Sequence, residues 1–496
     1  MKINPTISLL VFAAPLAISC NVPLKTEDQP ERPNFIFLFA DDQDFLAIGA
    51  AGNQVVKTPN IDLLASQGTM FSHCFTQGSW TPAVCIASRA MLITGKFIYH
   101  AQRDVNRAKL WTEAFSDSGY LTFLTGKWHN NDRNALRSFD IIRGMTPGMY
   151  ETKGGVGGPG YYRPTPENNT WSPHDRSLLG HWSPEVKDMV ASGGDKSFGE
   201  PYRVEQHTSE LLADNAVEFL ENHAKDSDQP FFMYVAFNAP HDPRQSPKEF
   251  VDMYDPSLIP LPANYLPEHP FDQGDRYTLR DEILAPFPRT PGVVRTHIHE
   301  YYAIITHMDR EIGRILEALD KTGLSDNTYI IFTSDHGLAV GQHGLMGKQN
   351  QYDHSIRVPF VISGPGIPGG RVSDEMVYLY NLYATTCELA GIGVPEQVEF
   401  KSIVPLLKGH GGSGYEAIFG SYVNYQRMVR TRDYKLILYP EAGEVQLFNM
   451  EEDPWETNNL FYKPEYGRVV STLYGKLTRL QQEVGDTMVL SGMGIR

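Results

Sequence analysis

The chain has 496 residues, of which 41% are hydrophobic and 11% aromatic, a composition typical of a globular protein too long for one small core. Its formal net charge of −16 argues against a basic surface that follows nucleic-acid phosphates, so we expect no nucleic-acid partner. A small anionic substrate is compatible with this charge, because a local basic pocket can lie inside an acidic protein.

The N-terminus has the pattern of an export signal in residues 1–20. Lys2 supplies a positive charge, and the apolar run over residues 7–18 is too short to cross a bilayer as a stable helix. Two interpretations stay open: a lipoprotein signal that leaves a lipid anchor on Cys20, and ordinary secretory cleavage nearby. Either one predicts an exported protein, periplasmic or anchored at the outer membrane and cell surface of a bacterium, with residues 21–32 as a polar tether.

Three cysteines remain after Cys20, namely Cys74, Cys85 and Cys387. So few cysteines predict no disulfide framework, despite the exported setting. A bridge between Cys74 and Cys85 is conceivable, but it would consume a thiol that lies in the most distinctive stretch of the sequence.

Buried strands are predicted where short apolar runs end in polar turns. Residues 35–40 form a continuous apolar run, the pattern of a strand covered on both faces in a parallel sheet. Further strands are predicted over residues 120–125, 231–237, 328–333 and 360–363. Helices are predicted from residue 58 to a stop at Gly68, from a start near Cys85, over residues 208–222, and through residues 305–319 to a stop at Gly323.

This alternation of strands and helices predicts an α/β fold with a large, mostly parallel sheet flanked by helices. Two long segments, residues 144–200 and 251–294, interrupt the alternation, and we interpret both as insertions that shape a pocket rim.

The C-terminal part has a different pattern. After an apparent linker at residues 409–414, alternating runs at 428–439 and 445–448 predict a small antiparallel sheet, and a final helix is predicted over residues 468–483. We therefore expect a catalytic domain over residues 33–412 and a C-terminal subdomain over residues 413–496.

Polar side chains follow the predicted strands at their carboxyl ends, where the ligand sites of parallel sheets lie. Asp41 and Asp42 follow one strand, and Asp335 and His336 follow another. Each pair alone is compatible with capping a turn or helix, but together they gather three carboxylates, which a divalent cation would neutralise. We predict a metal site with these four ligands. Oxygen-rich ligation favours Ca²⁺ or Mg²⁺, and we expect Ca²⁺, although His336 is an unusual ligand for either ion.

Cys85 lies at the start of a predicted helix, with Arg89 on the same face four residues later. Backbone N–H groups and the positive end of the helix dipole point the same way, so this position suits an anion. A buried free cysteine on a core-facing helix is the alternative interpretation.

Four further residues are candidates for a cationic lining around the metal. Lys127 and His129 lie two residues apart on a segment expected to be extended, so they should face the same way. His241 lies in a rigid turn between prolines, and Lys348 lies in a glycine-rich loop shortly after Asp335. Each alone is compatible with a surface or structural role.

With these motifs the chain resembles the type I sulfatases, which share the alkaline-phosphatase-like fold, from residue 33 to about residue 460. The most specific motif is Cys85-Ile86-Ala87-Ser88-Arg89, which is similar to the family signature Cys-x-Pro/Ala-Ser-Arg. In that signature the cysteine is oxidised to Cα-formylglycine. Other stretches match family motifs in the same order: Gly126-Lys127-Trp128-His129, Pro240-His241-Asp242-Pro243, Thr333-Ser334-Asp335-His336-Gly337, Gly347-Lys348, Tyr352, Arg357-Val358-Pro359, Glu452-Asp453-Pro454 and Asn459-Leu460.

The chain departs from the family pattern at three places. Ala87 replaces the commoner proline, and the resemblance then implies a formylglycine-generating maturase of the anaerobic, radical type. His336 replaces the commoner asparagine, as in the iduronate-2-sulfatase-like branch. Residues 381–385 replace a usual Asp-x-x-Pro-Thr, which we interpret as structural drift.

The resemblance also implies roles for the residues of the site. Asp335 would lie near the attacking hydroxyl of the hydrated aldehyde at position 85, and His129 near the other hydroxyl. Arg89 would hold the diol, Lys127 and Lys348 would neutralise sulfate oxygens, and His241 with Lys348 would protonate the leaving alcohol.

Three functions are compatible with these features. The first is hydrolysis of a sulfate ester on a small sulfated substrate, expected to be a carbohydrate or glycosaminoglycan fragment. The second is hydrolysis of phosphate or phosphonate monoesters on the same fold, and the third is a surface lipoprotein that binds sulfated glycans without cleaving them. We favour the first and leave the sugar, the sulfate position and the oligomeric state open.

Overall fold

A nine-stranded sheet forms the centre of the protein in the computed structural model, which describes Met1, residues 32–150 and residues 172–490 apart from positions 193, 225, 226, 228 and 276. The strand order is β12-β2-β13-β11-β1-β10-β4-β5, with β14 paired to β2. The strands are β1 (Asn34–Ala40), β2 (Gly68–Phe75), β4 (Leu121–Lys127), β5 (Ile141–Thr146), β10 (Phe231–Ala236), β11 (Thr328–Ser334), β12 (Arg357–Val358), β13 (Phe360–Ser363) and β14 (Arg371–Tyr378).

The part of the sheet from β11 to β5 is parallel throughout, as the sequence predicts. Leu38 of β1 pairs with Val235 of β10 on one side and with Phe332 of β11 on the other. Beyond β11 the direction changes, because β13 pairs antiparallel with β11 and β2 pairs antiparallel with β13. The parallel part therefore brings the carboxyl ends of β11, β1, β10 and β4 to one edge of the sheet.

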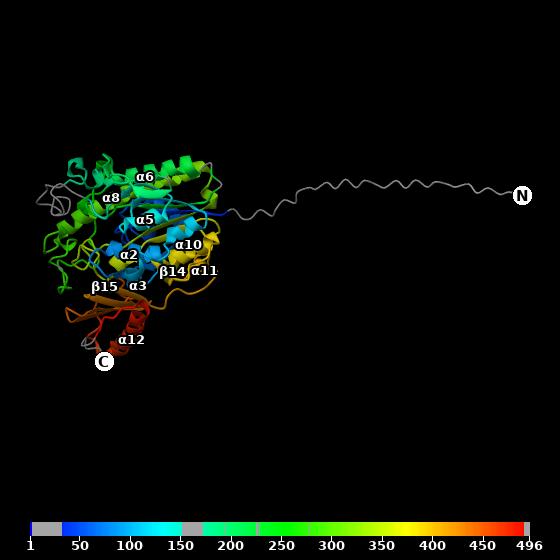
Figure 1. Ribbon diagram of the computed structural model, residues 1–496. Helices are drawn as coiled ribbons and strands as arrows, with labels where there is room; N and C mark the ends of the chain where they lie inside the picture. The colour runs from blue at the N-terminus through cyan, green and yellow to red at the C-terminus, as the bar shows by residue number, and fades with distance from the viewer. Residues whose placement is uncertain are drawn as a thin grey trace. The chain divides into compact units, whose positions relative to one another are not determined.

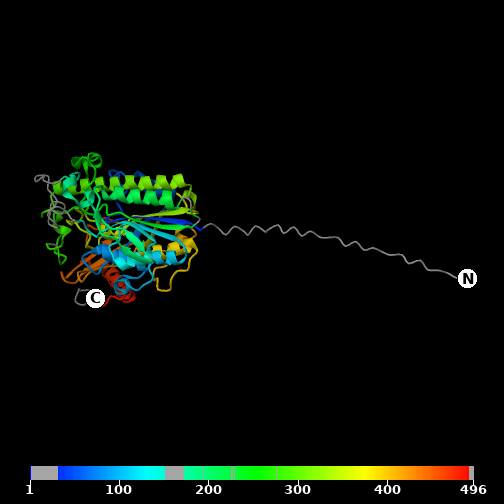
Figure 2. The same cartoon turned by 45° about the horizontal axis from the view of Figure 1, so that its top comes forward.

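Alternate residues of β1 point into two hydrophobic layers, which explains why this strand is apolar at every position. Phe35, Phe37 and Phe39 lie in one core cluster, and Ile36 and Leu38 lie in another. Both layers are made of helices, so the sheet is covered on its two faces as predicted (Figures 1 and 2).

The helices divide between these two layers. On one face α1 (Pro59–Gln67), α6 (Thr208–Phe219) and the long α8 (Pro291–Thr322) share the second cluster. On the other face lie α2 (Val84–Thr94), α3 (Ile98–Asp104), α4 (Trp111–Asp117), α5 (Asp132–Ser138) and α10 (Leu382–Ala390). Helix α1 ends before Gly68 and α8 ends at Gly323, whose φ of 75° suits glycine, so both predicted stops are confirmed.

A second sheet of five strands lies beside α12 (Gly467–Val484), in the order β18-β17-β16-β15-β3. Its antiparallel strands are β15 (Ile418–Tyr422), β16 (Gln426–Arg430), β17 (Tyr434–Tyr439) and β18 (Glu444–Asn449). The short β3 (Gly78–Ser79) joins it in parallel with β15, which was not predicted. Because β3 leads into α2, the small sheet is tied directly to the segment that carries Cys85, and residues from Arg32 onward form one compact unit. A domain division at residue 413 stays a prediction.

The two insertions contain short elements. The described part of the first includes β6 (Glu185–Val186), β7 (Met189–Ser192) and β8 (Asp195–Phe198), and β9 (Tyr202–Arg203) pairs with β6. The second begins at the end of α7 (Lys248–Val251) and contains two short 3-10 turns. The expected export signal, Cys20 and the tether up to residue 31 lie outside the described residues. Every helix in the described part of the chain is too short or too polar to span a bilayer.

Candidate active site

The carboxyl ends of β1 and β11 meet and hold three aspartates in fixed positions. Asp41 and Asp42 follow β1, and the backbone N–H of Asp335 donates to the carbonyl of Ala40 at 3.2 Å. The backbone N–H of Asp42 donates in turn to Oδ1 of Asp335 at 3.2 Å. Asp42 has a φ of 73°, a left-handed conformation that is uncommon for residues other than glycine and clusters at functional sites.

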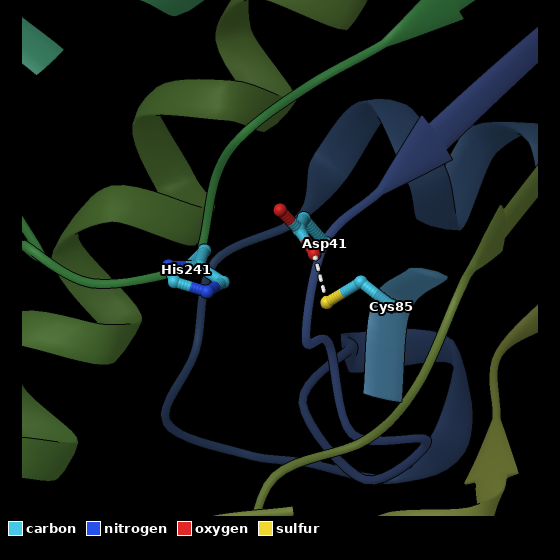
Figure 3. Close-up of side chains that lie close together, drawn as sticks. All are labelled: Asp41, Cys85 and His241. Atoms are coloured by element: carbon cyan, nitrogen blue, oxygen red, sulfur yellow. Dashed lines mark hydrogen bonds between the residues drawn. The ribbon is translucent and has the colours of Figure 1, made fainter. Parts of the chain in front are cut away.

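Cys85 lies in the first turn of α2, and its thiol faces the carboxylate of Asp41 (Figure 3). Its Sγ is 3.2 Å from Oδ1 of Asp41 and 3.1 Å from Nζ of Lys348. Burial, with the negative charges of Asp335 and Asp41, raises the pKa of the thiol well above its usual value, so it is protonated at neutral pH. Cys74 is a separate free cysteine, so the conceivable bridge is not formed.

Arg89 lies on the same face of α2, one turn after Cys85, and is fully buried. Its Nε donates to Oδ2 of Asp335 at 2.8 Å, and its Nη1 donates to the backbone carbonyl of Lys127 at 2.7 Å. Burial alone would raise the pKa of Asp335, but the positive charges of Arg89, Lys127 and Lys348 outweigh it and hold this pKa below its usual range.

A group of potential metal ligands combines Asp41, Asp42, Cys85 and Asp335, with one ligand atom from each lying within 4.8 Å of the others. Three carboxylates supply the hard oxygen donors that Ca²⁺ and Mg²⁺ prefer, so this donor set fits such a cation. His336 follows directly, but its two buried ring nitrogens do not belong to the group. The fourth member of this group is thus Cys85 and not His336. Ligation of the metal by His336 stays a prediction.

Two lysines balance the negative charge of the aspartates. The Nζ of Lys127, at the end of β4, forms an ion pair with Asp41, and the Nζ of Lys348 lies 2.5 Å from Oδ1 of Asp42. Burial raises the pKa of Asp42 to about 8, although the charge of Lys348 acts in the opposite direction. Each lysine therefore lies against one of the aspartates, and a bound anionic substrate and cation would rearrange these contacts.

His241 and His129, the two histidines expected to act on protons, both line the pocket that contains Cys85. His241 follows β10, with Nε2 3.8 Å from Oδ2 of Asp42 and Nδ1 2.6 Å from the carbonyl of Asp242. A second potential ligand group joins it to Asp41 and Cys85 (Figure 3). Burial, with Lys348 and other nearby cations, lowers the pKa of His241 well below its usual value.

The expectation for His129 was wrong in one respect. The segment after Lys127 is not extended, because His129 has a left-handed φ of 54°. Its ring still lines the pocket that contains Cys85. Burial and the charges of Lys127 and Arg89 lower the pKa of His129 to about 2, so the ring is neutral.

The pocket above Cys85 has a volume of about 620 Å³, and both the second insertion and the small sheet contribute to its wall. Sequence reasoning missed Arg280, whose guanidinium forms ion pairs with Asp242 and Asp281, and Gln349, whose Nε2 donates to Asp281 at 2.8 Å. It also missed Tyr425 in the turn between β15 and β16. The only signal for Arg280 was its position in a predicted rim insertion.

Two protein-family models match the chain. A family model described as Sulfatase matches residues 33–392. The chain belongs to the sulfatase family. A second model, described as the C-terminal part of N-sulphoglucosamine sulphohydrolase, matches residues 341–483. The protein is therefore a sulfuric ester hydrolase with the alkaline-phosphatase-like fold.

Individual relatives are distant but extend over the whole chain. An N-acetylglucosamine-6-O-sulfatase of Bacteroides thetaiotaomicron is 26% identical over 98% of this chain and 92% of its own. A structure solved with D-glucosamine-2-N,6-O-disulfate as its substrate has a TM-score of 0.71 at 22% identity, over 92% of this chain and 99% of its own. The phosphonate monoester hydrolase of Agrobacterium radiobacter has a TM-score of 0.69 at 23% identity, over 91% and 96% respectively. At these identities the two structures show the fold alone.

Proposed function

We propose that this sulfatase hydrolyses a sulfate ester on a carbohydrate, and that Cys85 is converted to Cα-formylglycine by a maturase before catalysis. The observation that carries the proposal is the position of Cys85, whose side chain lies at the N-terminus of α2 against Asp41 and Lys348 and lines the pocket. The carbohydrate part rests on the named substrates of similar proteins, which include N-acetylglucosamine-6-O-sulfate esters.

A thiol alone does not suit this chemistry. If a thiol attacked the sulfur atom, it would offer no second hydroxyl to expel the product. A hydrated aldehyde at position 85 offers two hydroxyls. The oxygen of one attacks sulfur while the bond from sulfur to the alcohol oxygen breaks. The other then loses a proton, so that the carbonyl forms again and inorganic sulfate leaves.

The surrounding side chains can support both steps. Arg89, held by its hydrogen bond to Asp335, would orient the diol, and Asp335 would lie near the attacking hydroxyl. Lys127 and Lys348 would neutralise the sulfate oxygens as charge develops in the transition state. The neutral ring of His129 would accept the proton of the second hydroxyl.

His241 and Lys348 both line the pocket beside Cys85, and they would together protonate the leaving alcohol once the negative charge of a bound sulfate ester favours the protonated form of His241. A divalent cation, Ca²⁺ in our proposal, would be held by Asp41, Asp42 and Asp335, with His336 as the expected fourth ligand. When bound, it would act as a Lewis acid that lowers the pKa of the attacking hydroxyl.

Export to the periplasm or cell surface is part of the proposal. It is supported by the charged and apolar pattern of residues 1–20, followed by Cys20 and a polar tether. An enzyme that degrades sulfated glycans outside the cytoplasm would meet its substrate there.

The proposal is tested with protein coexpressed with an anaerobic-type maturase. Mass spectrometry of the peptide containing Cys85 should show an aldehyde in place of the thiol, and 4-nitrophenyl sulfate should be hydrolysed faster than 4-nitrophenyl phosphate. Cys85→Ala should abolish turnover. A peptide that keeps its thiol in an active preparation would contradict the formylglycine step, and faster phosphate hydrolysis would favour a phosphate or phosphonate esterase.

A further inference from the structure

The outer wall of the pocket is built from three segments that are distant in the sequence. They are the lining residues of 275–281 in the second insertion, residues 423–425 between β15 and β16, and Glu441 between β17 and β18. We call these residues the outer rim. Cys85, the reacting position, is buried, whereas Glu441 of the outer rim is exposed. The outer rim therefore faces the sugar to which the sulfate group is attached.

Two charged residues of the outer rim compensate each other. Arg280 forms ion pairs with both Asp242 and Asp281. Asp281 is buried, and it also accepts a hydrogen bond from Nε2 of Gln349 at 2.8 Å. The charge of Arg280 is therefore engaged within the protein and leaves little attraction for an anionic substrate.

Two acidic residues of the outer rim lack such compensation among the described side chains. Asp275 accepts a hydrogen bond from the hydroxyl of Tyr422 at 2.8 Å, and neither Asp275 nor the exposed Glu441 forms an ion pair with any described side chain. Arg276, next in the sequence, is outside the described residues. Asp275, Tyr425 and Glu441 line the same pocket. The negative charges of Asp275 and Glu441 act with burial to raise the pKa of Tyr425.

The ring of Tyr425 also fixes the outer rim in place. A Cβ built on Gly274 would lie 2.4 Å from Cδ1 of Tyr425, so the ring packs directly against the backbone of the second insertion. Only glycine permits this close approach, and its φ of 128° is also one that other residues rarely adopt. The small sheet and the insertion therefore present one preformed wall.

We propose that the outer rim selects saccharides whose ring beside the sulfate ester is neutral or bears an amine, and disfavours rings that carry a carboxylate. This proposal rests on the carbohydrate sulfatase function proposed above. Carboxylates accept strong hydrogen bonds from sugar hydroxyls and ammonium groups, whereas they repel a uronate held beside them. The net charge of −16 acts in the same direction at longer range.

Two series of 4-nitrophenyl saccharides test the proposal, one of glucosides and one of glucuronides. Each compound carries one sulfate at O2, O3 or O4, and matched members of the two series differ only at C6. The wild-type enzyme should show a kcat/KM at least about 10-fold higher for the best glucoside than for its matched glucuronide, and this ratio should fall as salt screens the charges. Glu441→Lys and Asp275→Asn should each lower the ratio several-fold. Because the ratio does not depend on the fraction of matured enzyme, a poorly folded variant remains interpretable.

Glu451→Lys is the matched control, because Glu451 is exposed and does not line the pocket, and it should leave the ratio unchanged. Preference for the glucuronides, hydrolysis of neither series, or an unchanged ratio in both rim variants would overturn the proposal. The same preparation is also assayed with 4-nitrophenyl sulfate. If only the proposal on the outer rim is wrong, this compound is hydrolysed, whereas it remains intact if the sulfatase function itself is wrong.

Discussion

The backbone of Gly148 lies directly against the imidazole of His129. A Cβ built on Gly148 would lie 2.1 Å from Nε2 of His129 and 2.2 Å from its Cδ2, far closer than real atoms approach. The Nδ1 of His129 is buried and has no hydrogen-bond partner among the described residues. Packing against Gly148 therefore contributes to holding this ring at the pocket wall.

Gly148→Ala should displace His129 and reduce turnover of 4-nitrophenyl sulfate by about 100-fold, since a misplacement of about 1 Å in a catalytic group can have that effect. The loss should fall mainly on kcat, and circular dichroism should show an intact fold. Gly393→Ala is the control, because a Cβ there would meet nothing within 4 Å. Equal activity of the two variants would show that His129 tolerates displacement.

Asp42→Ala should abolish turnover, because it removes one of three carboxylates that fit a divalent cation and the ion-pair partner of Lys348. Chelation should inactivate the wild-type enzyme, Ca²⁺ should restore its activity, and Ca²⁺ should raise the melting temperature of the wild type but not of the variant. Asp252→Ala removes an exposed aspartate with a surface ion pair and should behave like the wild type. An active Asp42→Ala enzyme would refute the assigned site.

The position of the site was predictable because it depends on strand ends. Asp41 and Asp335 each follow an apolar run, and parallel strands of an α/β sheet bring such ends to one edge. The turn at His129 was not predictable, since a left-handed φ at a histidine has no sequence signal comparable to glycine. The outer rim was not predictable either, because Arg280 and Glu441 line one pocket only when the small sheet packs against the insertion.

A buried ion network joins the small sheet to the segment before β12 and predicts a large effect on stability. Nζ of Lys435 in β17 lies 2.6 Å from Oδ1 of Asp353 and 2.6 Å from Oε1 of Glu456, and its side chain is fully buried. Lys435→Met should lower the free energy of unfolding by about 3–5 kcal/mol, because Glu456 remains buried without this partner and Asp353 keeps only its ion pair with Arg430. Urea denaturation measures the change. Lys476→Met, at an exposed pair with Glu416, should cost less than about 1 kcal/mol.

The stability of the protein should also depend on pH through His73 in β2. Burial lowers the pKa of His73 to about 4, and the positive charges of Arg357 and Arg430 act in the same direction. The unfolded chain, with an ordinary histidine pKa of 6.5, therefore binds this proton more readily than the folded protein does. The stability that a neutral His73 contributes is complete above pH 6.5 and is lost as the pH falls toward 4.

His73→Gln removes this titration, since glutamine is neutral at every pH. Between pH 7 and pH 4.5 the wild type should therefore lose about 1–3 kcal/mol more unfolding free energy than the variant. This energy range is discounted for partial exposure of the ring. Urea denaturation at several pH values measures this difference, and the pH dependence of all other groups cancels in it. His174→Gln, at a solvent-exposed histidine, is the matched control for the substitution. Parallel curves for wild type and His73→Gln would show that His73 keeps an ordinary pKa in the folded protein, because the cost of its protonation would then be equal in both states.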